Sequence, residues 1–202
     1  MAVKNNDKPR YTAEEFFKMI PETDIKVELI NGEIVSDYPL DDLIKGIPAP
    51  EMFAGPTAEH QSVVVGLSYE FVSYIRRNKG RCRSFVSPLD VVLNDYTVFQ
   101  PDVFIVCDPG KIKGNKVEGA PDLVVEVLSP GSKKRDIVDK YNAYSNGGVR
   151  EYWIVDPIKK VTVVYQFGDT VDISFYPFDK PVPVGIWGNE HTVNISEMLD
   201  EG

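Results

Sequence analysis

The chain has 202 residues, of which 43% are apolar and 26% are charged, a composition typical of a soluble globular protein with enough apolar surface for a core. No apolar run approaches the roughly 20 residues of a membrane-spanning helix, and the first residues lack the apolar core of a secretory signal. The formal net charge of −9 argues against a protein that coats nucleic acid through a broad basic face, although it is compatible with an acidic metal site beside a local basic patch.

No segment reads as a linker, so we expect one domain over residues 1–202, with its core at about 57–157. The two cysteines, Cys82 and Cys107, have no metal-binding spacing. The plain interpretation is a pair of reduced thiols in a cytoplasmic protein that makes no membrane contact.

The N-terminal part predicts a helix, a hairpin and a loop. Residues 11–20 have the capping-box spacing of Thr12 and Glu15 followed by an apolar face, which indicates a short helix. Residues 25–37 place Asn-Gly between two apolar runs, the strongest short-range signal for a β-hairpin. Residues 38–56 are rich in proline and glycine and predict a long loop, either a functional lid or a mobile segment.

The central part predicts a helix and three strands. Residues 57–78 have apolar positions at helical spacing and end in cations before a glycine. Three strand-like segments follow at 85–93, 98–108 and 122–129, and a surface loop separates the last two at 109–120.

The C-terminal part predicts a second helix over 132–148, opened by Ser132 and closed by two glycines. A buried strand at 151–157, a meander over 161–178 and a short terminal helix at 194–202 complete the chain. The element order predicts an α/β (α+β) sandwich around a mixed sheet.

One residue does not fit a strand that is buried only for packing. Glu126 lies within PDLVVEVLSP, an apolar run that is typical of a strand buried on both faces. A buried carboxylate is unfavourable unless it is paired or binds a metal. Glu126 therefore has either a structural partner, for which Lys140 is a candidate, or a chemical role.

Two further aspartates are candidates to join Glu126. Asp122 lies four positions earlier on the same expected strand, about 13 Å away at about 3.3 Å per residue, which is too far to share one metal ion. Asp102 lies in the preceding strand. If the two strands pair, opposite side chains come within about 5 Å, a distance that suits two oxygen ligands of Mg²⁺.

A hydrolytic metal site also benefits from a nearby cation. The natural position, two residues after Glu126, holds the inert Leu128. In the next helix, Lys140 lies between Ile137 and Tyr144 of an apolar stripe, so it borders the inward face. The alternative for Lys140 is a lysine whose stem merely runs along the core.

The chain resembles the Uma-two family, a bacterial family described as endonucleases of the PD-(D/E)XK, restriction-endonuclease-like superfamily. The segments that carry the resemblance are QPD at 100–102, PDLVVEVLSP at 121–130, KYNAY at 140–144 and GVREYWIVDP at 148–157, with VELINGEIV at 27–35 and SPLDVVL at 87–93. The resemblance implies a restriction-endonuclease-like mixed β-sheet core flanked by helices, with an N-terminal hairpin and extra C-terminal strands.

The resemblance also implies an activity and its residues. Asp102, Glu126 and the carbonyl of Val127 would hold Mg²⁺ or Mn²⁺, and Lys140 would replace the strand lysine of the superfamily, which is absent because Leu128 stands there. The implied function is a metal-dependent endonuclease that hydrolyses phosphodiester bonds of nucleic acid, with DNA the favoured substrate. Many enzymes of this fold act as dimers, so a homodimer is the corresponding expectation.

Three more residues are possible supporting members of the site: His60, Glu28 and Asp90. The plainer interpretation is a satisfied core histidine for His60 and a structural pair with a lysine for Glu28. The basic run at 76–83 is a phosphate-contacting segment or a solvated helix end. The alternative functions are a non-catalytic nuclease-fold interaction or regulatory module and a metal-dependent hydrolase of a small phosphoester, which the acidic balance suits better.

Overall fold

The computed structural model describes residues 9–21, 23, 25–36, 38–47, 56–129 and 134–199. Its centre is a six-stranded mixed sheet with the order β12-β11-β10-β9-β6-β3. Only β9 and β10 pair in parallel in this sheet. Its strands are β3 (Arg83–Val86), β6 (Val103–Val106), β9 (Leu123–Val127), β10 (Glu151–Asp156), β11 (Val161–Phe167) and β12 (Val171–Pro177).

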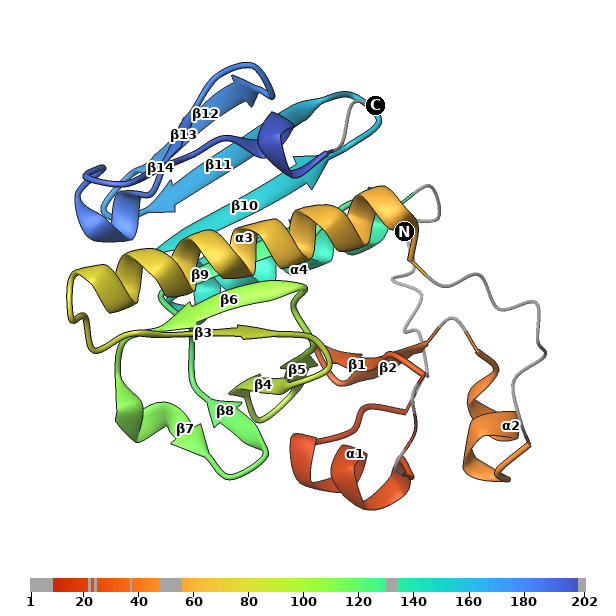
Figure 1. Ribbon diagram of the computed structural model, residues 1–202. Helices are drawn as coiled ribbons and strands as arrows, with labels where there is room; N and C mark the ends of the chain where they lie inside the picture. Colours follow the sequence, from red (N-terminus) through yellow and green to blue (C-terminus); the bar gives the residue numbers. More distant parts are fainter. Residues whose placement is uncertain are drawn as a thin grey trace, which may run out of the picture.

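Two helices cover the two faces of this main sheet (Figure 1). α3 (Ala58–Arg77) packs on one face through an apolar stripe that includes Leu67 and Phe71. α4 (Lys134–Gly147) packs on the other through Ala143 and Tyr144. Because β9 lies between the helices, all of its side chains are buried, which explains why its sequence is a continuous apolar run.

A second six-stranded sheet, with the order β2-β1-β5-β4-β8-β7, lies beside the main one (Figure 1). Its strands are β1 (Val27–Ile30), β2 (Glu33–Ser36), β4 (Asp90–Asn94), β5 (Thr97–Phe99), β7 (Ile112–Lys113) and β8 (Lys116–Glu118). The Asn-Gly hairpin joins β1 and β2 as predicted, with Asn31 and Gly32 both at positive φ. The mixed α+β class predicted from the element order is confirmed.

Two of the predicted strands are wrong in their extent. Residues 85–93 contain the end of β3 and most of β4, and residues 98–108 contain the end of β5 and all of β6, so each segment changes sheet in its middle. Pro88 and Pro101 mark the two changes. Proline has no N–H to donate to a ladder, so each strand ends there and the chain turns into the other sheet.

The helix predictions hold with smaller corrections. α1 (Ala13–Met19) begins with the predicted capping box of Thr12 and Glu15, and α3 is capped by Thr57. The expected loop after the hairpin contains a short helix, α2 (Leu40–Ile44), and residues 48–55 of it lie outside the described part. The expected loop at 109–120 contains a 3₁₀ turn together with β7 and β8. Ser132, expected to open α4, also lies outside the described residues.

The C-terminal segment returns along the α3 side of the main sheet. It contains β13 (Val182–Pro183), β14 (Thr192–Val193) and the 3₁₀ turns η2 (Gly185–Trp187) and η3 (Ile195–Met198), the last in place of the expected terminal helix. The buried carboxylate of Glu151 on β10 attaches this segment, because it accepts hydrogen bonds from the N–H groups of Gly185 (3.1 Å) and Ile186 (2.7 Å). No helix in the described ranges is long and apolar enough to cross a membrane.

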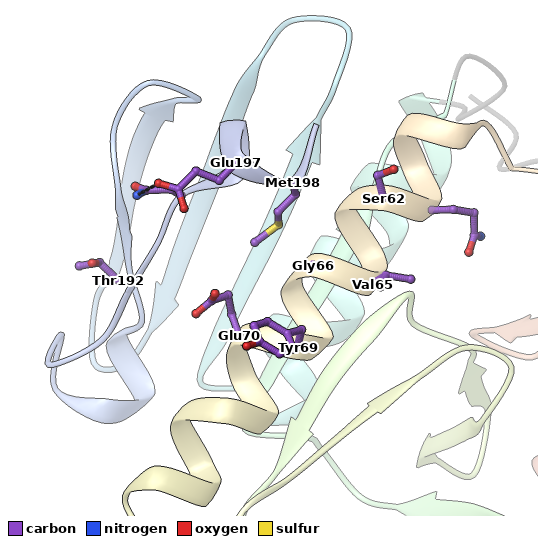
Figure 2. A pocket seen from close by; sticks show the side chains of 10 residues that line it. Ser62, Val65, Gly66, Tyr69, Glu70, Thr192, Glu197 and Met198 are labelled. Atoms are coloured by element: carbon purple, nitrogen blue, oxygen red, sulfur yellow. Dashed lines mark hydrogen bonds between the residues drawn. The ribbon is translucent and has the colours of Figure 1, made fainter. Parts of the chain in front are cut away.

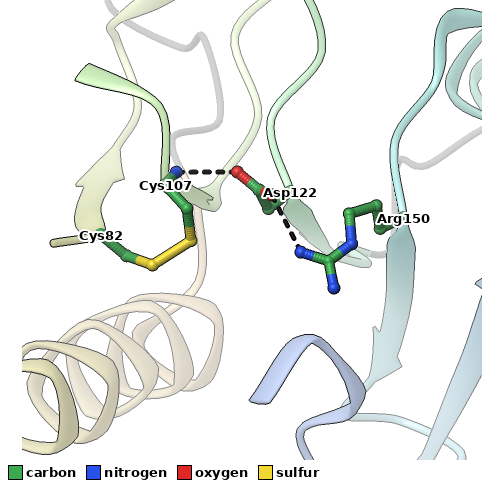
Figure 3. Close-up of a disulfide and its surroundings, with 4 residues drawn as sticks. All are labelled: Cys82, Cys107, Asp122 and Arg150. Carbon is green, nitrogen blue, oxygen red and sulfur yellow. Dashed lines mark hydrogen bonds and ion pairs between the residues drawn. A yellow bond between two sulfur atoms is a disulfide. The ribbon is translucent and has the colours of Figure 1, made fainter. Parts of the chain in front are cut away.

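Cys82 and Cys107 form a disulfide, which corrects the expectation of two reduced thiols (Figure 3). The residues next to them, Arg83 and Val106, are partners in the β3–β6 ladder, so the cysteines face each other one step beyond it. The spacing of 25 residues gave no sign of this contact, because strand register creates it. Figure 3 also shows Asp122, which accepts a hydrogen bond from the Cys107 N–H at 2.7 Å.

Cys82→Ser should lower the free energy of unfolding by about 3 kcal/mol, since the cross-link restricts the unfolded chain. A reducing agent should lower the melting temperature of the wild type toward that of the variant and leave the variant unchanged. Two reactive thiols in wild-type protein unfolded without reductant would contradict the disulfide.

Candidate functional site

Three buried carboxylates meet at one end of the main sheet. β6 and β9 pair in antiparallel register with Val103 opposite Val125, so the next pair outward is Asp102 and Glu126, as predicted if the two strands paired. Glu28 joins them from β1 of the second sheet. The three residues are 7–8% exposed, so their charges need partners within the protein.

Lys140 is the central partner of this cluster. Its Nζ lies 2.9 Å from Oε1 of Glu126 and 3.2 Å from Oε1 of Glu28. One turn later on α4, the Tyr144 hydroxyl donates to the same Oε1 of Glu126 at 2.7 Å. The ammonium of Lys140 thereby links α4 to both sheets, and its side chain is buried rather than merely bordering the core.

The electrostatics fix the charge of Lys140. Burial alone lowers the pKa of Lys140, but the carboxylates of Glu126 and Glu28 outweigh burial and raise it. Burial raises the pKa of Glu126, whereas for Glu28 the charges of Lys140 and Lys26 and the Gln100 N–H outweigh burial and lower the pKa. Lys140 is therefore a permanent cation and cannot serve as a general base near neutral pH.

Asp102 is held by a different set of donors. Its Oδ2 accepts a hydrogen bond from the Val127 N–H at 2.8 Å and lies 3.3 Å from His60 Nε2. Lys26 Nζ is 3.7 Å from Oδ1. Burial raises the pKa of Asp102, but these donors and charges outweigh it and lower the pKa to about 2. Asp102 is ionised at neutral pH.

His60 comes from the first turn of α3 and is buried. Because the Asp102 carboxylate can only accept, the Nε2 of His60 carries the hydrogen in this contact. Its Nδ1 is buried and has no hydrogen-bond partner among the described residues. His60 thus contacts the cluster directly, so it is more than a histidine packed in an apolar core.

Asp90 does not touch the cluster directly but is linked to it through Gln100. The N–H of Gln100 donates to Glu28 Oε1 at 3.0 Å, and the side-chain amide of Gln100 donates to Asp90 Oδ1, also at 3.0 Å. Burial raises the pKa of Asp90. Asp90 therefore reaches the cluster through Gln100 rather than by its own carboxylate.

Sequence reasoning missed the parts played by Lys26, Gln100 and Tyr144. A signal existed for Tyr144, because it lies four residues after Lys140 and so shares its helix face. Asp122 was correctly separated from the cluster: it accepts from the Cys107 N–H and pairs with Arg150 at 3.1 Å. Glu28 does pair with a lysine, but chiefly with Lys140 of α4.

The surface near the cluster is hollowed on the side of the second sheet. A pocket of about 710 Å³ lies between α1, β1 and the β7–β8 hairpin, and Gln100, Asp90 and Lys116 are in its lining. Another pocket lies between α3 and the C-terminal segment, near Tyr69 and Met198 (Figure 2), and has a volume of about 620 Å³. Neither pocket is lined by Asp102, Glu126, Glu28 or Lys140, and the first adjoins the cluster only through Gln100.

The donor set fits a hard divalent cation. Both hydrogen bonds to Glu126 from the described residues end on Oε1, and none of these residues donates to Oε2. Within that part of the chain, no three Asp, Glu, His or Cys side chains form a ready-made metal cage. Mg²⁺ commonly binds through one or two carboxylates and keeps several waters, so a pair such as Asp102 and Glu126 suits it. The Val127 carbonyl as a third donor stays a prediction.

Comparisons with known proteins identify the family and the fold of the chain. Residues 13–183 match the Uma2 family, described as a putative restriction endonuclease. An uncharacterised protein of Synechocystis sp. is 26% identical over 166 residues, which cover 81% of this chain and 78% of that protein. The crystal structure of a putative nuclease belonging to DUF820, from Anabaena variabilis, has the same fold, with a TM-score of 0.70, 22% identity, and coverage of 93% of this chain and 96% of that one.

The donors around Asp102 should make the stability of the protein depend on pH. The pKa of Asp102 is lower in the folded protein than its ordinary value of 3.8. Its carboxylate therefore stabilises the fold at pH values above 3.8, and this stabilisation is lost as the pH falls toward about 2. The contribution is about 2 kcal/mol. The free-energy difference between wild type and Asp102→Asn should therefore shrink by that amount from pH 5 to pH 2 in urea unfolding. Asp95→Asn, at an exposed carboxyl in the turn between β4 and β5, is the control, and a pH-independent difference for Asp102→Asn would refute the assignment.

The second prediction concerns Lys140. Lys140→Met leaves two buried carboxylates without their cation and should lower the free energy of unfolding by about 3 kcal/mol or more. Adding Glu126→Gln should restore part of the loss. Lys18→Met removes an exposed partner of Glu14 and should change little. If Lys140→Met lowers the free energy of unfolding in urea no more than Lys18→Met does, then Lys140 is not the cation that stabilises Glu126 and Glu28.

Proposed function

Since the chain belongs to the Uma2 family, we propose that it is a Mg²⁺- or Mn²⁺-dependent endonuclease that hydrolyses phosphodiester bonds of nucleic acid, with DNA the favoured substrate. The observation that carries the proposal is the buried pair of Asp102 and Glu126, opposite each other in strand register, with Lys140 at 2.9 Å from Glu126. A nuclease family implies a hydrolase and a nucleic-acid substrate in general; metal dependence and DNA are the proposed refinements.

Asp102, Glu126 and the Val127 carbonyl would hold the cation. A divalent cation bound there supplies Lewis-acid polarisation of the phosphate and a lowered pKa for a bound water. Asp102 is prepared for this task, because its carboxylate is ionised and fixed by the Val127 N–H and His60. Tyr144 and Lys140 fix Oε1 of Glu126, and Oε2, to which no described residue donates a hydrogen bond, would bind the cation.

Lys140 would act as a positioned positive charge. Its ammonium stays protonated between Glu126 and Glu28, so it can orient a water or stabilise negative charge that develops on the phosphate. His60 would be a positioning residue that keeps Asp102 in place. Glu28 would position Lys140, and Asp90 would support Glu28 through Gln100.

The distribution of cations bears on the substrate. The exposed basic residues at 76–83 lie at the far end of α3 from His60, about 25 Å along the helix. They could touch a flanking phosphate of a long substrate but not the phosphate that is cleaved. Nucleic acid as substrate favours a cytoplasmic location, where the Cys82–Cys107 disulfide would have to resist reduction.

A non-catalytic module is the alternative that a specific observation favours. Lys140, Tyr144 and Glu126 already satisfy one another by hydrogen bonds, and Leu128 stands where the superfamily motif has its lysine. Such a network could be purely structural. This alternative predicts that no activity depends on the carboxylates.

Cleavage assays distinguish the two. Purified protein is incubated with supercoiled plasmid, single-stranded DNA, RNA and a small chromogenic phosphodiester, with Mg²⁺, Mn²⁺ or chelator. Cation-dependent cleavage should fall by about 100-fold or more in Asp102→Asn and Glu126→Gln, while Asp122→Asn, directly before β9 but outside the cluster, keeps it. Equal cleavage by wild type and Glu126→Gln, or no cleavage of any substrate by wild type, would reject the proposed endonuclease.

A further inference from the structure

β12 ends the main sheet and pairs on one side only, with β11, among the described residues. Its odd-numbered side chains are large, apolar and exposed: Val171 at 43%, Ile173 at 47% and Phe175 at 67%. Successive side chains of a strand alternate between faces, so these three share one face of the sheet. A row of this kind on a sheet edge needs an explanation.

The apolar row continues onto α4. In the β11–β12 ladder Ile173 lies opposite Tyr165, and the Tyr165 ring packs against Tyr141 of α4 with centroids 4.9 Å apart. The row is therefore on the α4 face of the sheet. Val138, three residues before Tyr141 and 49% exposed, extends the apolar surface along the helix.

The same residues also carry the unpaired backbone groups of the edge. One step beyond the ladder, the Phe178 N–H donates to the Lys160 carbonyl at 3.1 Å. Hydrogen-bonded and non-hydrogen-bonded pairs alternate in an antiparallel ladder. The even-numbered residues of β12 therefore bond to β11, and Val171, Ile173 and Phe175 direct their N–H and C=O groups away from it.

β12 has little edge protection over residues 171–176. Sheet edges are commonly protected by charged residues, prolines or bulges, and on the outward side of β12 only its last residue, Pro177, is of this kind. β3, the opposite edge strand, begins with the exposed Arg83. β12 runs without a bulge along its ladder, and its one charge, Asp172, lies on the face away from the apolar row.

We propose that β12 pairs antiparallel with β12 of a second copy, with Ile173 opposite Ile173 at a two-fold axis, so that two main sheets join into one. In this register Val171 faces Phe175 on the apolar side and Asp172 faces Ser174 on the polar side. Every outward N–H and C=O of the three odd residues then has a partner. This surface goes beyond the proposed activity and does not rest on it.

Neighbouring registers are less favourable. A two-fold axis at Ser174 brings Val171 opposite Pro177, which has no N–H to donate. An axis at Asp172 places two carboxylates opposite each other, which is destabilising. Of these three registers, only the axis at Ile173 avoids both problems, and this self-complementarity favours a second copy of this chain over an unrelated strand as the occupant of the edge.

The test is the mass of the full-length protein in solution, measured by light scattering after size exclusion and by analytical ultracentrifugation. Wild type should have twice the mass of one chain. Ile173→Lys and Ile173→Glu should each weaken the dimer by about tenfold or more, because like charges meet at the axis and apolar contact is lost. An equimolar mixture of the two variants should recover the dimer, since Lys then faces Glu. Val65→Lys, at an apolar residue of α3 that is 64% exposed, should leave the dimer intact.

Circular dichroism checks that each variant is folded, and Phe175→Lys replaces Ile173→Lys if the latter is not. A wild-type monomer at micromolar concentration overturns the proposal. So does a dimer that survives both Ile173→Lys and Phe175→Lys, or one that Val65→Lys dissociates, which would assign the interface to the exposed face of α3.

Discussion

The ammonium group of Lys140 holds the architecture of the site together. It comes from α4, and its two carboxylate partners come from different sheets, Glu126 from β9 and Glu28 from β1. Neither carboxylate tolerates burial alone, so the positions of the helix and the two sheets depend on one cation. The hydrogen bonds of Tyr144 to Glu126 and of the Gln100 N–H to Glu28 then fix the oxygens that Lys140 contacts.

The cluster gathers more charged groups than one ion pair. Glu28, Asp102 and Glu126 bring three carboxylates together, and the basic side chains beside them are Lys140, Lys26 and His60. Burial, and after it the charges of Asp102 and Glu28, raise the pKa of Glu126 in spite of the two lysines. Buried ion pairs often stabilise a fold no better than apolar side chains of similar size. We propose that the cluster is a cation site, because Asp102 and Glu126 lie opposite each other in strand register and no described residue donates a hydrogen bond to Oε2 of Glu126.

The sequence predicted the features that depend on local chemistry. The Asn-Gly hairpin, the capping box of Thr12 and the buried strand around Glu126 each follow from short stretches of chain. The approach of Asp102 to Glu126 was predictable once two strands were expected to pair. The split of two strands at Pro88 and Pro101 was also visible in principle, but the apolar runs around both prolines masked it.

The rest depends on contacts between distant parts of the chain. Glu28 and Lys140 are 112 residues apart in the sequence, and they meet because the second sheet places β1 beside α4. The Cys82–Cys107 disulfide likewise follows from the register of β3 and β6. The free edge of β12 could not be inferred either, because an alternating strand has the same sequence pattern whether or not another strand lies beside it.

The central claim is that Asp102 and Glu126 are prepared to bind a divalent cation. Calorimetric titration of Mn²⁺ into the metal-free wild type, Asp102→Asn, Glu126→Gln and Asp122→Asn tests it most directly. The account predicts saturable binding by wild type and Asp122→Asn, and its loss in the two cluster variants while they remain folded. Absence of binding by wild type, or equal binding by all four proteins, would contradict it and leave the cluster as a structural ion-pair network.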